Sequence, residues 1–456
     1  MQRALAAMAI VLGLAVGATP GLAGGGKSGA QIKTIALGSA LPVPPWPKAA
    51  PPMDSALPYM FSRLSTQDRQ AFNALVAAYA RDLEASDKLQ GAFADLLRLV
   101  QLAVFGQVVK LTVDPKGYLK VEMSGQGSLG PDSDAAALLR LLATRVNQPL
   151  GGGILPGTGA GALRPADMVR VIAHIVAAPE SISQGTGTYT CVSAALERVL
   201  AQTWPGEYAR ITAGLVWDGR VALQNGKVVP IAGSAKTGPG GGKRTVCSKA
   251  FQESLLGFAQ QVPPETCTKE LGDYRNARLA KSGGTTDPYG GGRYSSRTAY
   301  SGGRYSSAAT YGAGRFSSVR VYGAGEMATE PAPTGAGEAA YDGAAAPGGV
   351  TIGQARWLYI QVLGDTPQTL VVTDGNRDSV FSRLVYVLGK KNPLPVIAGV
   401  KGVDAAGNAT HHVVTLISYA QSGSFQLADS GQDGDNNQIT VDAAGLRAAL
   451  ELVFDF

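Results

Sequence analysis

Three residues far apart in the chain have the side chains that nucleophilic catalysis by a thiol requires: Cys191, His412 and Asp429. Cys191 opens a predicted helix that continues through residues 192–200. At a helix start, unpaired backbone N–H groups and the helix dipole lower the pKa of a thiol. An imidazole must then protonate the leaving group, and a carboxylate must orient that imidazole. We therefore expect a Cys–His–Asp site.

The choice of histidine follows from the predicted elements. His174 lies in the apolar helical pattern of residues 169–175, which predicts a packed or rim histidine rather than a ligand. His411 and His412 open a predicted strand that runs to Tyr419. Neighbouring strand residues face opposite sides, so only one of the two can reach the thiol. Asp429 ends the next predicted strand, where it can orient that imidazole across a hairpin.

The first 23 residues predict a secretory signal. They contain a charged start at Arg3, an apolar run over residues 4–16 and small residues before a cleavage position at Ala23. No other long apolar stretch follows, so no membrane span is expected in the mature chain. We expect a secreted or periplasmic protein.

Three cysteines in an exported chain leave one thiol unpaired or bridged to another molecule. Cys247 and Cys267 flank the predicted helix 248–261 and could form a disulfide across it. Cys191 would then be the free thiol. Because a free thiol is a liability in an oxidising compartment, its presence favours a chemical role.

The chain of 456 residues is long enough for at least one sizeable core, although its 60 glycines and 16% charged residues predict extensive loops or linkers. Its formal charge of +6 is mild and selects no partner class. The expected organisation is a signal peptide (1–23), a Pro/Gly-rich leader (24–58), a mostly helical N-terminal region with a hairpin (59–180), a Cys-bearing half (181–281), a low-complexity insert (282–350) and a His/Asp-bearing half (351–456).

Helical periodicity and turn signals predict the individual elements. In the N-terminal region, which is expected to be either a scaffold or a pro-segment, Ser65 is predicted to cap a helix. Further helices are predicted over 88–105, 133–145, 165–177, 378–388 and 442–453, strands over 357–363, 369–373, 395–400, 411–419 and around 425, and hairpins over 108–121 and 220–229.

The insert contains an 11-residue repeat in which Tyr289, Tyr300, Tyr311 and Tyr322 recur with arginine, glycine and serine. Interleaved Arg and Tyr could stack on bases or sugars and pair with phosphates. The composition has too little aliphatic content for a core and favours a disordered linker. An anionic envelope polymer is a candidate partner of these repeats, and nucleic acid is not the expected one.

The chemistry-bearing stretches resemble the papain-like cysteine peptidase superfamily, including bacterial leader peptidases. Gln184 precedes Cys191 through a Gly-rich loop, and His412-Val413-Val414-Thr415-Leu416-Ile417-Ser418-Tyr419 is similar to the family pattern His-x-Val-x-x-x-Gly-Tyr. Asp429 stands where papain has Asn. Gln184 is seven residues before Cys191, one more than is usual in the family, and no Trp follows Cys191.

The resemblance implies an α+β fold with a helical half that carries Cys191 and an antiparallel β half that carries His412 and Asp429. It favours His412 over His411. It also implies that Gln184 and the Cys191 backbone N–H bind the oxyanion. The implied activity is hydrolysis of peptide bonds in a peptide or protein substrate, with no cofactor and no metal.

Two other functions stay open. A transglutaminase-like acyl transferase would use the same Cys–His–Asp order. A non-catalytic envelope- or matrix-binding protein would instead act through the Arg/Tyr repeats.

Overall fold

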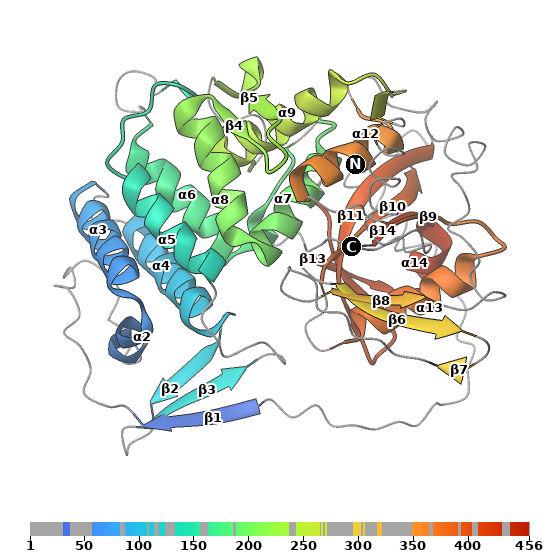
Figure 1. Ribbon diagram of the computed structural model, residues 1–456, viewed down its shortest axis with the longest axis horizontal. Coiled ribbons are helices and arrows are strands. Elements are labelled where there is room, and N and C mark those ends of the chain that lie inside the picture. The colour runs from blue at the N-terminus through green and yellow to red at the C-terminus, as the bar shows by residue number, and fades with distance from the viewer. Residues whose placement is uncertain are drawn as a thin grey trace. The chain divides into compact units, whose positions relative to one another are not determined.

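The computed structural model describes residues 31–36, 57–82, 87–106, 109–113, 118–123, 133–155, 163–185, 188–236, 243–264, 266–267, 270, 295–301, 304–305, 317–321, 349–363, 368–390, 394–403, 409–430 and 438–455 (Figure 1). The predicted signal peptide, residues 1–23, lies outside this part of the chain. The described elements mix helices with antiparallel strands, so the protein is of the α+β class, as predicted.

The chain divides into two compact units. The first consists of Met1–Val221, Pro230–Ser254 and Val372–Glu451, and the second of Ala222–Val229, Leu255–Val371 and Leu452–Phe456. Cys191, His412 and Asp429 all belong to the first unit, together with the N-terminal helical region. Residues from both predicted halves, 181–281 and 351–456, therefore contribute to one unit.

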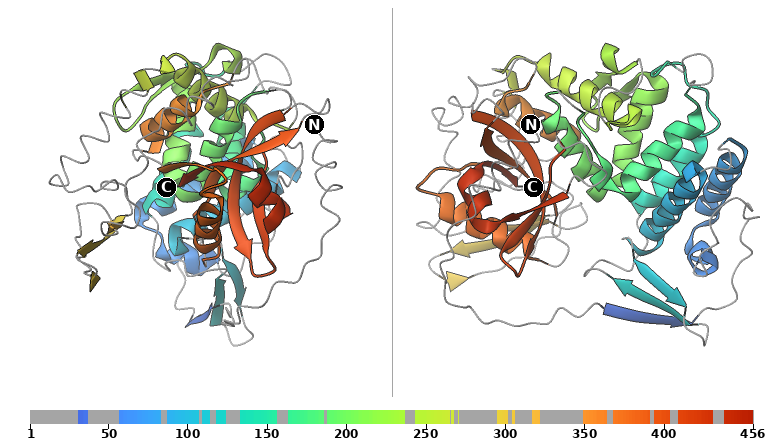
Figure 2. Two further views of the ribbon diagram at one scale, coloured as in Figure 1. Left: turned by 90° about the vertical axis from the view of Figure 1, so that its right-hand side faces the viewer. Right: turned by 180° about the vertical axis from the view of Figure 1, so that it is seen from behind.

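Helices from the N-terminal region gather side by side in the first unit (blue to green in Figures 1 and 2). Helix α3 packs on α5, α4 on α6 and α5 on α8, through side chains such as Phe72, Phe93 and Leu138 that are fully buried. The helices of this region are α2 (Leu57–Arg63), α3 (Thr66–Asp82), α4 (Asp87–Phe105), α5 (Ser133–Arg145), α6 (Pro165–Ala177) and the short η2 (Pro179–Ser181). They are followed by α7 (Cys191–Thr203), α8 (Pro205–Ala213) and α9 (Val246–Gln260), of which residues 246–254 belong to the first unit.

The predicted helix start at Ser65 is confirmed. The backbone N–H of Asp68 donates to Ser65 Oγ over 3.2 Å, which satisfies one of the unpaired amides at the start of α3. The carboxylate of Asp68 also pairs with Arg140 on α5. The cap thus begins the helix and ties it to its neighbour.

The two hairpins predicted from the sequence are both present. The predicted hairpin forms β2 (Lys110–Val113) and β3 (Tyr118–Met123), and β3 also pairs with β1 (Gln31–Ala36), a strand within the stretch expected to be a leader. The Asn-Gly hairpin forms β4 (Arg220–Ala222) and β5 (Val228–Pro230). Gly226 takes φ 84°, the left-handed conformation that such a turn requires.

An antiparallel sheet in the first unit has the strand order β13–β12–β11–β10. Its strands are β10 (Val396–Val403), β11 (Ala409–Ala420), β12 (Ser424–Ala428) and β13 (Gln438–Asp442), and α13 (Arg377–Leu388) packs against β11. The predicted strands at 395–400, 411–419 and 425 and the predicted helix 378–388 are confirmed. Helix α7 also contacts β11, so the helix that begins at Cys191 lies against the strand that contains His412.

One sequence prediction next to the insert was wrong in secondary structure. Residues 357–363, predicted as a strand, belong to helix α12 (Ile352–Leu363). The helix begins at a capping box in which Gln354 N donates to Thr351 Oγ1 and Thr351 N donates to Gln354 Oε1. This local signal outweighs the β-favouring aromatic and branched residues of the run.

The predicted final helix 442–453 begins as expected but is shorter. Asp442 caps α14 (Ala443–Ala449) by accepting from Gly445 N over 2.7 Å. The chain then becomes strand β14 (Leu450–Asp455), which pairs with β9 (Gln368–Val371). Val453 and Phe454 favour extended backbone, and their pairing with β9 ends the helix early.

The repeats, predicted to be a disordered linker, contain three short strands in the structure: β6 (Ser295–Ser301), β7 (Arg304–Tyr305) and β8 (Ser317–Val321). Strands β6 and β8 run parallel, with Ser295 opposite Ser317 and Ser296 opposite Ser318. Equivalent serines of different repeat copies therefore pair with each other. The sequence repeat itself supplies this register.

Among the described residues, no helix is long and apolar enough to cross a membrane. Cys191 and Cys247 are free thiols, so the proposed Cys247–Cys267 disulfide is absent. Cys247 is instead fully buried, and its Sγ donates to the carbonyl of Met168.

A close backbone approach in the first unit generates a stability prediction. Gly219 has φ 69°, and a Cβ there would collide with the carbonyl oxygen of Gly152. We expect Gly219→Ala to lower the free energy of unfolding by about 3 kcal/mol, because left-handed strain and a backbone clash add. Gly423→Ala is the matched control, since Gly423 has φ 84° with nothing within 4 Å. Urea denaturation that gives equal losses for both variants would contradict the clash.

Candidate active site

Cys191 is the first residue of α7 and is partly exposed. Thr190 stands at the N-cap position, and its side chain does not cap the helix but bonds elsewhere. The backbone N–H groups of Val192 and Val413 donate to the sulfur. Helix α7 therefore presents the thiol at its positive end, where a thiolate is favoured.

His412 lies on β11, opposite Val400 of β10, with 27% of its side chain exposed. Its Nε2 lies 2.6 Å from Asp429 Oδ1. This leaves Nδ1 as the ring nitrogen for the sulfur of Cys191, with which His412 also forms a hydrogen bond. The imidazole therefore bridges the thiol and the carboxylate.

Asp429 directly follows the last residue of β12, Ala428, and its side chain is 5% exposed. Strands β11 and β12 are antiparallel neighbours, so the end of β12 comes back beside the beginning of β11. The hairpin thus delivers the carboxylate to the far side of the imidazole, as the sequence predicted. The structure places His412 in contact with both Cys191 and Asp429.

The pKa values of Cys191 and His412 are both shifted from their ordinary values. Burial opposes a charged imidazole, but the hydrogen bonds to Asp429 and Cys191 and their negative charges together raise the pKa of His412 to about 10. Burial of the sulfur by itself would raise the pKa of Cys191. The hydrogen bond from His412, its positive charge and the two backbone N–H groups together outweigh burial, so the pKa of Cys191 is lowered. Both shifts favour a thiolate–imidazolium pair over a neutral thiol beside a neutral imidazole.

Arg198 on α7 supplies a further charge that sequence reasoning missed. It is 1% exposed, its Nη2 donates to Ile182 O over 3.2 Å, and it acts electrostatically on Asp429. Burial lowers the pKa of Arg198 to about 10, so it remains a cation at neutral pH. A buried cation near Asp429 favours the ionised carboxylate that orients His412.

Gln184 is buried and is held by the segment that carries Asp429. Its backbone N–H donates to Ser430 O over 2.8 Å, and Ser430 Oγ donates to its Oε1 over 3.3 Å. This contact turns the amide so that Nε2 faces away from Ser430. The backbone N–H of Cys191 has no intrahelical acceptor, because it belongs to the first turn of α7. Both groups predicted to bind an oxyanion are hydrogen-bond donors.

Two fully buried polar residues behind the nucleophile were also missed: Glu197 on α7 and Gln252 on α9. Glu197 accepts from Tyr208 Oη, Ser248 Oγ and Gln252 Nε2 over 3.2, 2.9 and 2.7 Å. In an isolated sequence they are one Glu and one Gln on amphipathic helices, where such residues ordinarily face solvent. The only available signal was the Glu-Arg pair inside an apolar helix.

The remaining chemistry-bearing residues lie elsewhere. His174 is a rim histidine, with 42% of its side chain exposed, and its Nδ1 is 2.9 Å from Asp95 Oδ2. The side chain of His411 lies outside the described part. Over the described residues, no group of three or more His, Cys, Asp or Glu side chains could hold a metal ion.

The arrangement can carry out acyl transfer. It joins a nucleophilic sulfur, a proton donor and acceptor, and an orienting carboxylate in one hydrogen-bonded series. Comparisons of the chain with protein-family models, with curated proteins and with solved structures found no match. The resemblance to papain-like peptidases therefore depends on these residues and on their geometry.

The shifted pKa of Cys191 can be read from its alkylation by iodoacetamide across about pH 4 to 9. In the wild type we expect the rate to rise through a midpoint below the 9.0 of an ordinary thiol. His412→Ala should move the midpoint upward and slow alkylation at about pH 6 by at least ~10-fold, because burial is then opposed only by the two backbone N–H groups. Asp429→Asn should move it less, since an amide oxygen still accepts from His412. Equal midpoints in all three proteins would contradict the ion pair.

Glu197 predicts a pH dependence of stability. Burial raises its pKa to about 7 from 4.5, against the lowering effect of Gln252, Ser248, Tyr208 and Arg198. Between these two values the unfolded state releases the proton while the folded state retains it, so stability falls as pH rises and then levels off. The total fall is up to about 3 kcal/mol. We expect Glu197→Gln to remove this slope in urea denaturation from about pH 5 to 7, whereas an unchanged slope would assign it to another group.

Proposed function

We propose that this protein is an exported cysteine peptidase of the papain-like type, which hydrolyses peptide bonds through a thiolate at Cys191. The observation that carries the proposal is the series of contacts from Cys191 to His412 and from His412 Nε2 to Asp429 Oδ1 at 2.6 Å. Export rests on the signal-like sequence of residues 1–23.

The arrangement of elements supports the same class. The nucleophile opens a helix that contacts the strand bearing the histidine, and the orienting carboxylate follows the adjacent strand. Gln184 lies on the loop before the nucleophile, one residue further from it than the glutamine with which the family binds its oxyanion. The N-terminal helices belong to the same compact unit as these residues, which favours a scaffold over a detachable pro-segment.

The proposed reaction has two stages. In the first, the sulfur of Cys191 attacks the carbonyl carbon, and the electron pair of the C=O bond moves to its oxygen. Gln184 Nε2 and the Cys191 N–H stabilise this oxyanion. The C–N bond breaks as His412 donates its proton to the leaving nitrogen, which yields an amine and a thioester.

In the second stage, water attacks the thioester and His412 accepts its proton. The C–S bond breaks, the acid product leaves, and the thiolate–imidazolium pair is restored. Asp429 holds the imidazole throughout and stabilises its positive charge.

Labelling with a thiol-reactive peptide electrophile tests the nucleophile. We expect covalent modification of Cys191 alone, with loss of labelling in Cys191→Ala and a fall of at least ~10-fold in rate in His412→Ala. Cys247→Ser is the matched control, because burial raises the pKa of the Cys247 thiol and makes it unreactive. Modification of Cys247 or Cys267, with Cys191 inert, would overturn the assignment.

The same protein can be used to distinguish the peptidase from the acyl transferase and from the envelope-binding protein. A peptidase releases acid product in the presence of a primary amine, whereas a transglutaminase-like enzyme transfers the acyl group to the amine. Deletion of residues 285–330 should leave hydrolysis intact. If that deletion abolishes binding to envelope polymer in a protein that never labels at Cys191, the Arg/Tyr repeats are the working part.

A further inference from the structure

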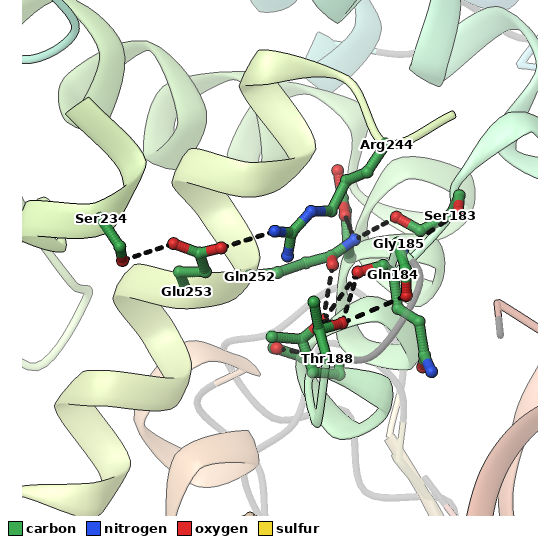
Figure 3. A network of polar contacts seen from close by, with 11 residues as sticks. Ser183, Gln184, Gly185, Thr188, Ser234, Arg244, Gln252 and Glu253 are labelled. Carbon is green, nitrogen blue, oxygen red and sulfur yellow. Dashed lines mark hydrogen bonds and ion pairs between the residues drawn. The ribbon is translucent and has the colours of Figure 1, made fainter. Parts of the chain in front are cut away.

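Gln252 lies at the centre of a fully buried polar cluster behind the proposed nucleophile (Figure 3). Its Nε2 donates to Ser183 O over 3.1 Å and to Glu197 Oε2 over 2.7 Å, while its Oε1 accepts from Thr190 Oγ1 over 3.0 Å. All of its polar atoms are therefore engaged. Buried amides are costly unless they are satisfied in this way.

Two hydrogen-bond partners of Gln252 stand next to the two proposed oxyanion donors in the sequence. Ser183 immediately precedes Gln184, and Thr190 immediately precedes Cys191. One side chain thus holds both ends of the loop that separates the two proposed oxyanion donors. Within the loop, Thr188 Oγ1 donates to Gln184 O over 2.6 Å.

The orientation of the Gln252 amide is fixed by Glu197. Above about pH 7 Glu197 is ionised, so its carboxylate and the Ser183 carbonyl only accept hydrogen bonds, and Nε2 must face both. Oε1 then faces Thr190, which donates its hydroxyl proton. Ser248 and Tyr208 donate to the other oxygen of Glu197 and hold the carboxylate in turn.

We propose that Gln252 and Glu197 form a positioning pair that sets the separation of Gln184 and Cys191, and with it the geometry of the oxyanion site. The inference rests on the proposed acyl-transfer chemistry at Cys191. Neither residue touches the reacting atoms. Oxyanion donors act only when they are held within a few tenths of an ångström of the developing charge, which a rigid buried amide provides and a loop alone does not.

The proposal predicts that a change at Gln252 affects acylation of Cys191 but not its alkylation. Alkylation by iodoacetamide needs the thiolate but develops no oxyanion. Acylation by p-nitrophenyl acetate needs the thiolate and also places negative charge on the carbonyl oxygen. A residue that positions oxyanion donors should therefore affect the second reaction and spare the first.

We expect Gln252→Met to lower the acylation rate constant by at least ~10-fold, while the alkylation rate and its pH midpoint stay within about 2-fold of the wild type. Gln101→Met is the matched control, because Gln101 is also a buried glutamine on a helix and binds Val109 N instead. Glu197→Gln should keep acylation within about 3-fold, since an amide oxygen can still accept from Gln252.

Thr190→Val keeps the test decisive if Gln252→Met does not fold, because it removes a single hydroxyl at the Cys191 end of the loop. That hydroxyl bonds Gln252 Oε1 over 3.0 Å and also bonds Gln184 O over 3.3 Å. It should lower acylation in the same selective way. Acylation equal to that of Gln101→Met, or a parallel fall in acylation and alkylation, would overturn the positioning role. A wild-type protein that is alkylated at Cys191 but never acylated would instead refute the proposed function.

Discussion

The hydrogen bond between His412 Nε2 and Asp429 Oδ1, at 2.6 Å, is the interaction on which the rest of the site depends. Asp429 is almost fully buried, and an isolated buried carboxylate would take up a proton rather than remain charged. It faces positive charge from His412 and from Arg198. Charges therefore alternate from the thiolate through the imidazolium and the carboxylate to the guanidinium, and each stabilises its neighbours in a medium of low dielectric constant.

The residues that follow β12 contact both His412 and Gln184. Asp429 orients the imidazole, while the next residue, Ser430, binds both the backbone and the side chain of Gln184. A shift of this turn would therefore displace His412 and Gln184 together. Since Gln252 holds the other side of the same loop, Gln184 is fixed from two directions by residues of different elements.

Sequence patterns predicted the local parts of this structure well. Helices α5 and α6 match their predicted bounds, because their periodic apolar residues and polar starts act within a few turns. The strand prediction over residues 357–363 was wrong, because the Thr351–Gln354 capping box begins a helix there despite the β-favouring composition. In the site, Cys191, His412 and Asp429 could be predicted because a thiol, an imidazole and a carboxylate are the side chains that thiol catalysis requires. Glu197, Arg198 and Gln252 were missed, because only tertiary contacts show that these polar side chains face inward.

The long sequence separation within the site has a modest energetic cost. Ser430 and Gln184 are 246 residues apart and still bond directly. Loop-closure entropy grows with the logarithm of length, so doubling the intervening chain costs only about 0.6 kcal/mol. Burial of a few side chains between α7 and β11 offsets that amount. An insert with its own repeat, such as residues 282–350, can therefore lengthen the connection without weakening the contacts that hold His412 against Cys191.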